Sequence, residues 1–236
     1  MKTPIEISKI LDVEQANNIF KKHKLILIEN IFEDKVYDSI QERYSEFPNN
    51  WWTWCCYPSM TGRDGWVEGS YPQYNYSVAS LSRGHFSYSF KRTIGDHVEG
   101  CDCIDCDMRK FVLSDDTLMW IEKITGVKLT GAQDTFSSKY EQGDFLSSHA
   151  DDPDKEDRKI AFVFNLTGQR DEKWSPDWGG LFMMTRENEP IKVIPPQPNS
   201  LVLFDVEDHI SPHLVTMVSR LNNGLTRLAF SGWWNR

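Results

Sequence analysis

Two residues near the middle of the chain have the types and spacing of a metal-binding pair. His149 and Asp151 follow the apolar-containing run 135–146 and are separated by one residue. If this run continues as a strand, residues two apart share one face, so the imidazole and the carboxylate point to the same side. Lone pairs that converge from a rigid strand edge suit a metal ion. A His-x-Asp pair also arises by chance, so these two residues alone do not establish a metal site.

A second histidine and an arginine follow in the later sequence. His213 comes after the strand-like run 199–205, and Arg227 lies fourteen residues further on, in a segment that alternates like a half-buried strand. Two imidazoles and one carboxylate on one face of iron(II) leave three positions open. The planar fork of an arginine matches a carboxylate through two hydrogen bonds, whereas a lysine supplies a point charge. His209 is the alternative third ligand, but it falls in a predicted loop, whereas His213 begins a predicted strand.

This ordered set resembles the iron(II)- and 2-oxoglutarate-dependent oxygenases, most closely the branch similar to prolyl 4-hydroxylases. The matching phrases cover about residues 135–234, and they are specific jointly rather than singly. They are Tyr140-x-x-Gly143-Asp144-Phe145-Leu146-x-x-His149-x-Asp151, Trp178-Gly179-Gly180, Pro198-Asn199-Ser200-Leu201-Val202-Leu203-Phe204 and Arg227-Leu228-Ala229-Phe230-Ser231-Gly232-Trp233. The resemblance implies an α+β, mainly β chain. Its core would be a double-stranded β-helix, a cupin-like jelly roll, braced by N-terminal helices.

The resemblance also implies roles for individual residues. The implied iron ligands are His149, Asp151 and His213. Arg227 would bind the distal carboxylate of 2-oxoglutarate. Tyr140 matches a tyrosine that touches the cosubstrate in similar enzymes, although a core tyrosine is an equally good interpretation. The strand 161–166 lacks the hydroxyl that the family often offers to that carboxylate, and Asn165 is the candidate substitute.

The implied reaction hydroxylates an unactivated C–H bond and converts 2-oxoglutarate and dioxygen to succinate and CO2. Iron(II) is the metal, and ascorbate is a candidate auxiliary reductant. The presence of Asp151 favours hydroxylation over halogenation, because related halogenases lack this carboxylate. The substrate is left open between a prolyl residue in a protein or peptide, a free amino acid and another small metabolite. A non-catalytic jelly-roll binding module is the alternative, but it would not need all four site residues. A zinc hydrolase is disfavoured because no His-Glu-x-x-His occurs.

Composition limits the class of protein and its partners. The chain has 236 residues with 39% hydrophobic and 13% aromatic residues, enough for one packed domain. The net charge of -9 disfavours a nucleic-acid partner, which would require a basic surface. No run approaches the roughly 20 apolar residues of a membrane span, and the start lacks a signal-peptide pattern. Five cysteines, an odd number, favour a reducing compartment, so we expect a cytoplasmic protein. The oligomeric state is not predicted.

Three cysteines lie close together before the predicted β core. Cys101, Cys103 and Cys106 fall within six residues. Thiolate and imidazole are ligands that zinc prefers, and a structural zinc site takes four. The candidate fourth ligands are His97, Cys55 and Cys56. The alternative is a loop that carries three reduced, unliganded thiols.

The remaining pattern divides a single domain, 1–236, into two parts. Residues 1–130 form a helical, loop-rich support, with helices over 12–24, 33–47 and 114–125 and strands at 25–28 and 85–90. Its aromatic-rich stretch 49–90 is either a set of loops pinned by aromatic residues or a substrate-facing lid. Residues 131–236 form the catalytic core. The strands expected in the core are 135–146, 159–166, 180–185, 191–194, 200–204, 213–218 and 226–233.

Overall fold

The computed structural model describes residues 3–8, 12–93, 100–151, 157–169, 173–186, 189–206, 212–219 and 226–236. The helices of this part are α1 (Val13–His23), α2 (Asp34–Ser45), α3 (Tyr71–Ser82), α4 (Ile104–Val112) and α5 (Asp115–Thr125). The strands are β1 (Leu25–Glu29), β2 (Trp52–Tyr57), β3 (Val67–Glu68), β4 (Tyr88–Thr93), β5 (Gly131–Tyr140), β6 (Phe145–His149), β7 (Arg158–Asn165), β8 (Phe182–Met184), β9 (Lys192–Ile194), β10 (Ser200–Asp205), β11 (His213–Val215) and β12 (Arg227–Asn235). Two short 3-10 helices, Asn49–Trp51 and Pro176–Trp178, lie between them.

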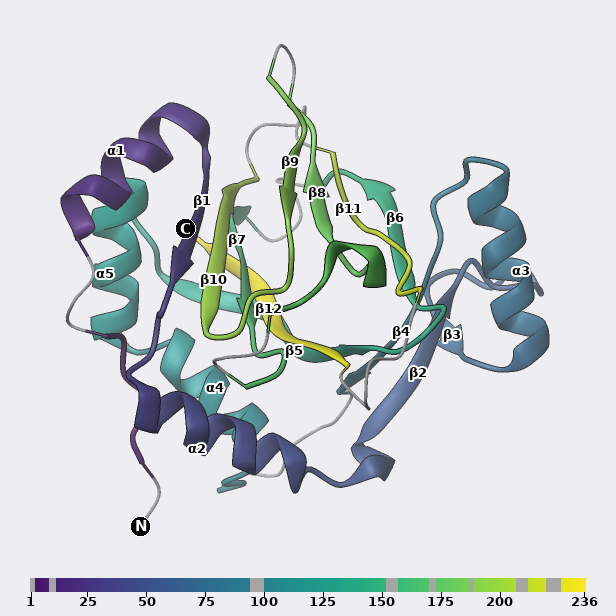
Figure 1. The fold of residues 1–236 in the computed structure, drawn as a ribbon, viewed down its shortest axis with the longest axis horizontal. Coiled ribbons are helices and arrows are strands. Elements are labelled where there is room, and N and C mark those ends of the chain that lie inside the picture. Colours follow the sequence, from purple (N-terminus) through teal and green to yellow (C-terminus); the bar gives the residue numbers. More distant parts are fainter. Residues whose placement is uncertain are drawn as a thin grey trace.

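The strands form one curled antiparallel sheet (Figure 1). Their order is β1-β10-β7-β12-β5-β4-β6-β11-β8-β9, with β2 and β3 attached at β4. The half that contains β8 and β9 turns back over the half that contains β7 and β10, because side chains of both halves form one core cluster. Phe182 of β8 and Phe204 of β10, for example, lie 5.6 Å apart between ring centroids. This two-layer arrangement is the predicted mainly-β double-stranded β-helix.

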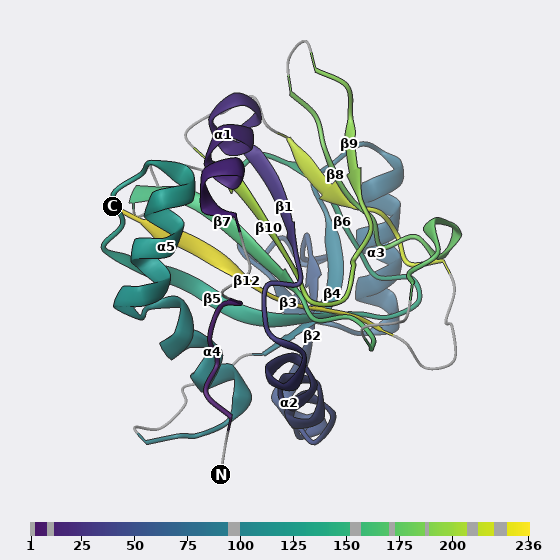
Figure 2. The ribbon, with the colours of Figure 1, turned by 60° about the vertical axis from the view of Figure 1, so that its left-hand side comes forward.

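Strand β10 separates two of the core clusters of the molecule. All six of its residues are buried, as expected for a continuous apolar run that is covered on both faces. Leu201 and Leu203 pack with the helices, whereas Val202 and Phe204 face the interior of the β-helix. Figure 2 shows α1, α4 and α5 on one side of the sheet, with α3 on the far side beside β4. The helices therefore pack on the outside of the β-helix, and side chains of the strands fill its interior.

The predicted helices of the N-terminal part are present, and their ends follow capping rules. The Asp12 side chain accepts a hydrogen bond from the Gln15 backbone N–H at the start of α1, and Ser114 does the same for Thr117 in α5. Gly126 adopts a left-handed conformation, with φ +74°, and ends α5. None of the helices in the described part of the chain is long and apolar enough to span a bilayer.

Helix α3 lies in the stretch where loops were expected, so that prediction was wrong there. Its N-cap is Ser70, whose side chain accepts from the Gln73 backbone N–H. The helix buries Gln73, Ser77 and Ser80, which have helical spacing but are polar. A search for apolar residues at helical spacing cannot find such a face. Helix α4, which has Cys103 as its N-cap and contains Cys106, was also not predicted.

The predicted strand 135–146 is two strands rather than one. β5 ends at Tyr140, and β6 begins at Phe145, with a turn between them. Gly143 has φ +90° in this turn, and a Cβ added there would lie 2.6 Å from the Tyr74 hydroxyl. The turn therefore requires glycine for both its backbone conformation and its contact with α3.

Candidate metal and cosubstrate site

The two histidines of the predicted metal site face each other across one strand pair. His149 ends β6, and His213 begins β11, which pairs with β6 so that the two residues are direct partners. Their ring centroids lie 4.3 Å apart. The pairing shifts register between His213 and Val215, and such a bulge turns side chains away from the regular alternation. The local strand geometry therefore aims both imidazoles at one point.

Asp151 completes a group of three potential ligands. Its Oδ1 atom lies 3.7 Å from His149 Nε2, and its Oδ2 atom lies 3.9 Å from His213 Nε2. One ligand atom from each of the three residues falls within 4.8 Å of the others. The Nδ1 atom of His149 lies 3.1 Å from the Ser147 carbonyl oxygen, which suits a tautomer that leaves Nε2 to bind a metal. Two imidazoles and a carboxylate at this spacing fit iron(II).

Trp233 holds the Asp151 carboxylate in place, a role that the sequence analysis missed. The indole Nε1–H donates to Asp151 Oδ2 over 2.8 Å. The Arg158 guanidinium lies over the Trp233 ring, 3.8 Å from its centroid, and also forms an ion pair with Asp134. Trp233 lies six residues after Arg227 in β12, an even spacing that places both on the inner face. This alternation in the sequence could have indicated that Trp233 faces the same side as Arg227.

Arg227 is buried in the same cavity without an acidic partner. It is 3% exposed, and its Nε–H has no hydrogen-bond acceptor. Its guanidinium carbon lies 4.8 Å from the centroid of the Tyr140 ring, which comes from the directly paired position of β5. No acidic residue of the described ranges forms an ion pair with it. Burial lowers the pKa of Arg227, although the Tyr140 hydroxyl opposes this effect. A buried cation with an unused donor fits an anionic ligand.

One partly open cavity of about 100 Å³ connects these groups. Its walls come from β4, β5, β6, β7, β8, β10, β11 and β12 and are mostly apolar or aromatic. The polar residues that line it are Ser138, Tyr140, His149, Asp151, His213, Arg227 and Ser231. Gly180 packs beside Arg227, because a Cβ added there would lie 3.4 Å from the arginine Cδ. The backbone of Gly180 has φ +66°, a left-handed conformation that favours glycine at this position.

The predicted role of Asn165 gains no support from its position. Its side-chain amide donates to Ser200 Oγ over 3.0 Å, and it is not among the residues that line the cavity. Two hydroxyls that the sequence analysis did not consider, Ser138 and Ser231, line the cavity instead. Tyr140 does line it, and burial raises the pKa of Tyr140 to about 12, so its hydroxyl stays protonated at neutral pH.

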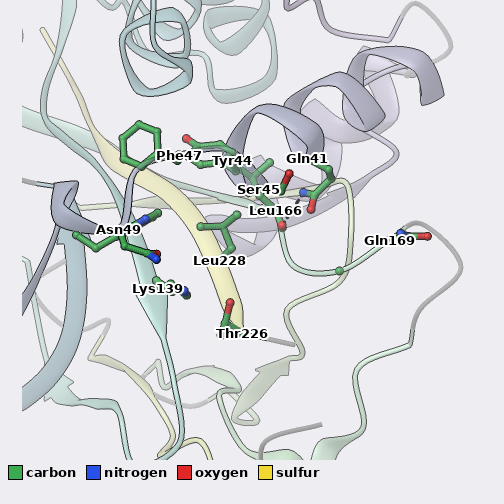
Figure 3. A pocket seen from close by; sticks show the side chains of 12 residues that line it. Gln41, Tyr44, Ser45, Phe47, Asn49, Lys139, Leu166, Gln169, Thr226 and Leu228 are labelled. Atoms are coloured by element: carbon green, nitrogen blue, oxygen red, sulfur yellow. Dashed lines mark hydrogen bonds between the residues drawn. The ribbon is translucent and has the colours of Figure 1, made fainter. Parts of the chain in front are cut away.

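A second, larger cavity of about 400 Å³ lies elsewhere (Figure 3). It is bordered by α2 and by Lys139 and Leu228, which alternate with inner-face residues of β5 and β12 and so lie on the outer face of these strands. Among the described residues, its lining contains no histidine, cysteine or carboxylate. The larger of these two cavities is therefore not the one that holds the potential metal ligands.

The turn after Tyr140 is tied to the N-terminal part by a buried acid. Asp144 accepts hydrogen bonds from the Ser89 hydroxyl over 2.7 Å and from the Glu141 backbone N–H over 2.9 Å. The Trp54 indole N–H in turn donates to Ser89 Oγ. Burial raises the pKa of Asp144 to about 6, more than these hydrogen bonds lower it.

The remaining predicted ligands lie apart from this cavity or outside the described residues. His97 and His209 are outside those residues. The sulfur atoms of Cys101, Cys103 and Cys106 form a group of their own, all within 4.8 Å of one another. Cys55 and Cys56 do not belong to this group; they are buried in β2, opposite Phe90 and Ser89 of β4.

Comparisons with known proteins agree with this fold. Residues 135–235 match the model of the 2OG-Fe(II) oxygenase superfamily. Over 133 residues, or 54% of this chain, the sequence is 33% identical to prolyl 3-hydroxylase OGFOD1 of Mus musculus. That match spans 23% of the relative's length.

Solved structures share the fold at low sequence identity. A Pseudomonas putida prolyl-4-hydroxylase is matched over 95% of this chain and 99% of its own, with 16% identity and a TM-score of 0.57. A Trichoplax adhaerens prolyl hydroxylase, solved with a peptide fragment of the hypoxia inducible factor oxygen degradation domain, is matched over 94% and 88%, with 15% identity and a TM-score of 0.63. A Burkholderia pseudomallei oxidoreductase of the 2OG-Fe(II) oxygenase family is matched over 96% and 92%, with 10% identity and a TM-score of 0.64. The expected double-stranded β-helix is confirmed.

Replacing Trp233 by phenylalanine should weaken metal binding. The ring keeps its place under Arg158, but the hydrogen bond to Asp151 is lost and the carboxylate is less well oriented. We expect the dissociation constant for manganese(II) to rise about tenfold, the low end of the range for such supporting partners. Calorimetric titration measures it, with Trp66→Phe at an exposed site as the control. An unchanged constant in Trp233→Phe would show that the indole does not position the carboxylate.

The raised pKa of Asp144 predicts a pH-dependent stability difference. The folded-state pKa of about 6 lies above the ordinary aspartate value, so the folded protein binds the proton more tightly. The stabilisation that this bound proton gives the folded state is fully present below pH 4 and is lost as the pH rises to about 6. A difference of two pKa units corresponds to about 3 kcal/mol of unfolding free energy. Asp144→Asn cannot ionise. The unfolding free energy of the wild type relative to this variant should therefore fall across that interval in urea titrations. A difference that is constant with pH would contradict the assignment.

Proposed function

We propose that this chain, whose residues 135–235 match the model of the 2OG-Fe(II) oxygenase superfamily, hydroxylates an unactivated C–H bond. The reaction consumes 2-oxoglutarate and dioxygen and releases succinate and CO2. One observation carries this proposal: a cluster of two histidines and an aspartate lines the same cavity as a buried arginine that has no acidic partner among the described residues. A metal and a dicarboxylate are the ligands that such a cavity fits.

In this proposal, His149, Asp151 and His213 hold iron(II), which when bound activates dioxygen for C–H oxidation. Arg227 binds the distal carboxylate of 2-oxoglutarate through its planar guanidinium. The Tyr140 hydroxyl lies beside that guanidinium and stays protonated, so it is able to donate a second hydrogen bond to the same carboxylate. Trp233 keeps the Asp151 carboxylate turned toward the imidazoles.

The apolar walls of the cavity exclude water around these groups. Phe182 and Phe204 pack against the His213 ring, at 5.7 and 4.8 Å between centroids. In a water-excluded site, the attraction between a guanidinium and a carboxylate is stronger than in solution. The same walls limit access of solvent to the metal. Ascorbate is proposed as an auxiliary reductant.

A prolyl residue in a peptide is the substrate class that we favour. The matched relative is a prolyl 3-hydroxylase, and one structure with the same fold was solved with a peptide. On this chain, Phe86 is 40% exposed and lies 5.3 Å from the His149 ring, with Tyr57 and Tyr88 packed around it. An exposed aromatic surface beside the metal ligands suits an apolar pyrrolidine ring. Free amino acids and other small metabolites are the competing substrate classes.

The cytosol is the proposed compartment. The structure describes all five cysteines, and none of them forms a disulfide. Reduced thiols persist where glutathione and thioredoxin keep them so.

Replacing Asp151 by alanine should abolish product formation, because two imidazoles alone hold iron(II) weakly and leave an extra position open. The wild type, loaded with iron(II) and 2-oxoglutarate, is screened by mass spectrometry against proline-containing peptides and against free amino acids. We expect a mass gain of one oxygen atom in one arm, together with succinate release, and neither in Asp151→Ala. The exposed change Asp116→Ala serves as the control and should keep activity. Full hydroxylation by Asp151→Ala would refute the ligand assignment.

A further inference from the structure

We propose that Cys101, Cys103 and Cys106 form a zinc site that is separate from the iron site. The three sulfur atoms lie within 4.8 Å of one another, and all three residues are half-buried. Four thiolates at zinc bond lengths of about 2.3 Å stand about 3.8 Å apart in a tetrahedron. A small adjustment of this group would therefore let all three sulfurs bind one ion. None of these residues lines the cavity that holds Arg227.

The start of helix α4 fixes two of the three ligands. Cys103 is the N-cap of α4, and its sulfur accepts from the Cys106 backbone N–H over 3.4 Å. The two cysteines are three residues apart, as in the Cys-x-x-Cys spacing of zinc sites. The positive end of the helix dipole favours thiolate at this position.

Buried polar contacts anchor this part of the backbone. Asp105, between Cys103 and Cys106, is fully buried and accepts from the Ser137 and Thr93 hydroxyls over 2.5 and 3.1 Å. On the other side, Arg43 of α2 donates to the Asp102 carbonyl oxygen over 3.0 Å. The backbone that carries the three sulfurs is thus held before any metal binds, which lowers the entropic cost of forming a site.

A metal at this position would strengthen the support of the iron site. Asp105 bonds to Ser137 of β5, and the next residue, Ser138, lines the cavity. Zinc would cross-link Cys101, Cys103 and Cys106 at the N-terminal end of α4, where Asp105 contacts β5. Three thiolates leave the fourth tetrahedral position to another protein ligand or to water.

Cobalt(II) substitution tests the site without relying on activity. Full-length wild-type protein, purified with reductant and stripped with a chelator, is titrated with cobalt(II) and, separately, with zinc(II). We expect strong near-ultraviolet charge-transfer absorption from cobalt thiolate bonds and its loss on addition of zinc. Zinc is counted by elemental analysis in the His149→Ala variant, because the intact iron site would also bind zinc. About one bound zinc per chain is expected there.

Matched variants locate the ion and separate it from the iron site. The Cys103→Ser, Cys106→Ser double variant should lose the absorption, and the same two changes made in His149→Ala should also lose the zinc. Cys55→Ser and His149→Ala should keep the absorption. Retention in His149→Ala would hold even if the proposed oxygenase activity were absent. The proposal is overturned if wild-type protein shows no thiolate absorption with cobalt. It is also overturned if the double variant keeps the absorption, or if the unreduced wild type, unfolded in guanidinium so that the buried Cys55 and Cys56 also react, has three reactive thiols instead of five, which would indicate a disulfide.

Discussion

The register between β6 and β11 is the constraint on which the candidate site depends. It places His149 directly opposite His213, and the short segment after β6 then brings Asp151 to the same point. A shift of one residue would turn every side chain of a strand to the other face and separate the two imidazoles. The apolar partners of β11 on its other side, including Phe182 of β8, fix this register because they must face the interior. Packing and ligand geometry are therefore specified by the same strand pairing.

The buried guanidinium is the second constraint, and it is an energetic one. Arg227 faces the ring of Tyr140 and has an unused N–H, so folding leaves its charge poorly compensated. Placing an uncompensated cation in a protein interior costs several kcal/mol. The rigid walls of β5 and β12, paired residue by residue around it, keep the side chain from turning out to water. A site that is costly when empty binds an anion strongly, since the ligand supplies the missing charge.

Local sequence patterns predicted the parts of the fold that follow simple periodicity. The capped helices α1 and α5 and the fully apolar strand β10 are such parts, and the spacing of His149 and Asp151 placed both on one edge. Contacts between distant segments were not predictable in this way. The bond from Trp233 to Asp151 joins residues 82 positions apart, and it depends on the strand register. Helix α3 was missed because the face that it buries is polar. The predicted role of Asn165 gained no support because its side-chain amide donates a hydrogen bond to Ser200.

Calorimetric titration of 2-oxoglutarate into the manganese(II)-loaded protein, under anaerobic conditions, tests the central claim most directly. We predict one binding event per chain, which requires the metal. This binding should be lost in both Asp151→Ala and Arg227→Met, because 2-oxoglutarate must contact the ion and the guanidinium at once. Binding that is equally tight without metal, or unchanged in Arg227→Met, would contradict the shared site.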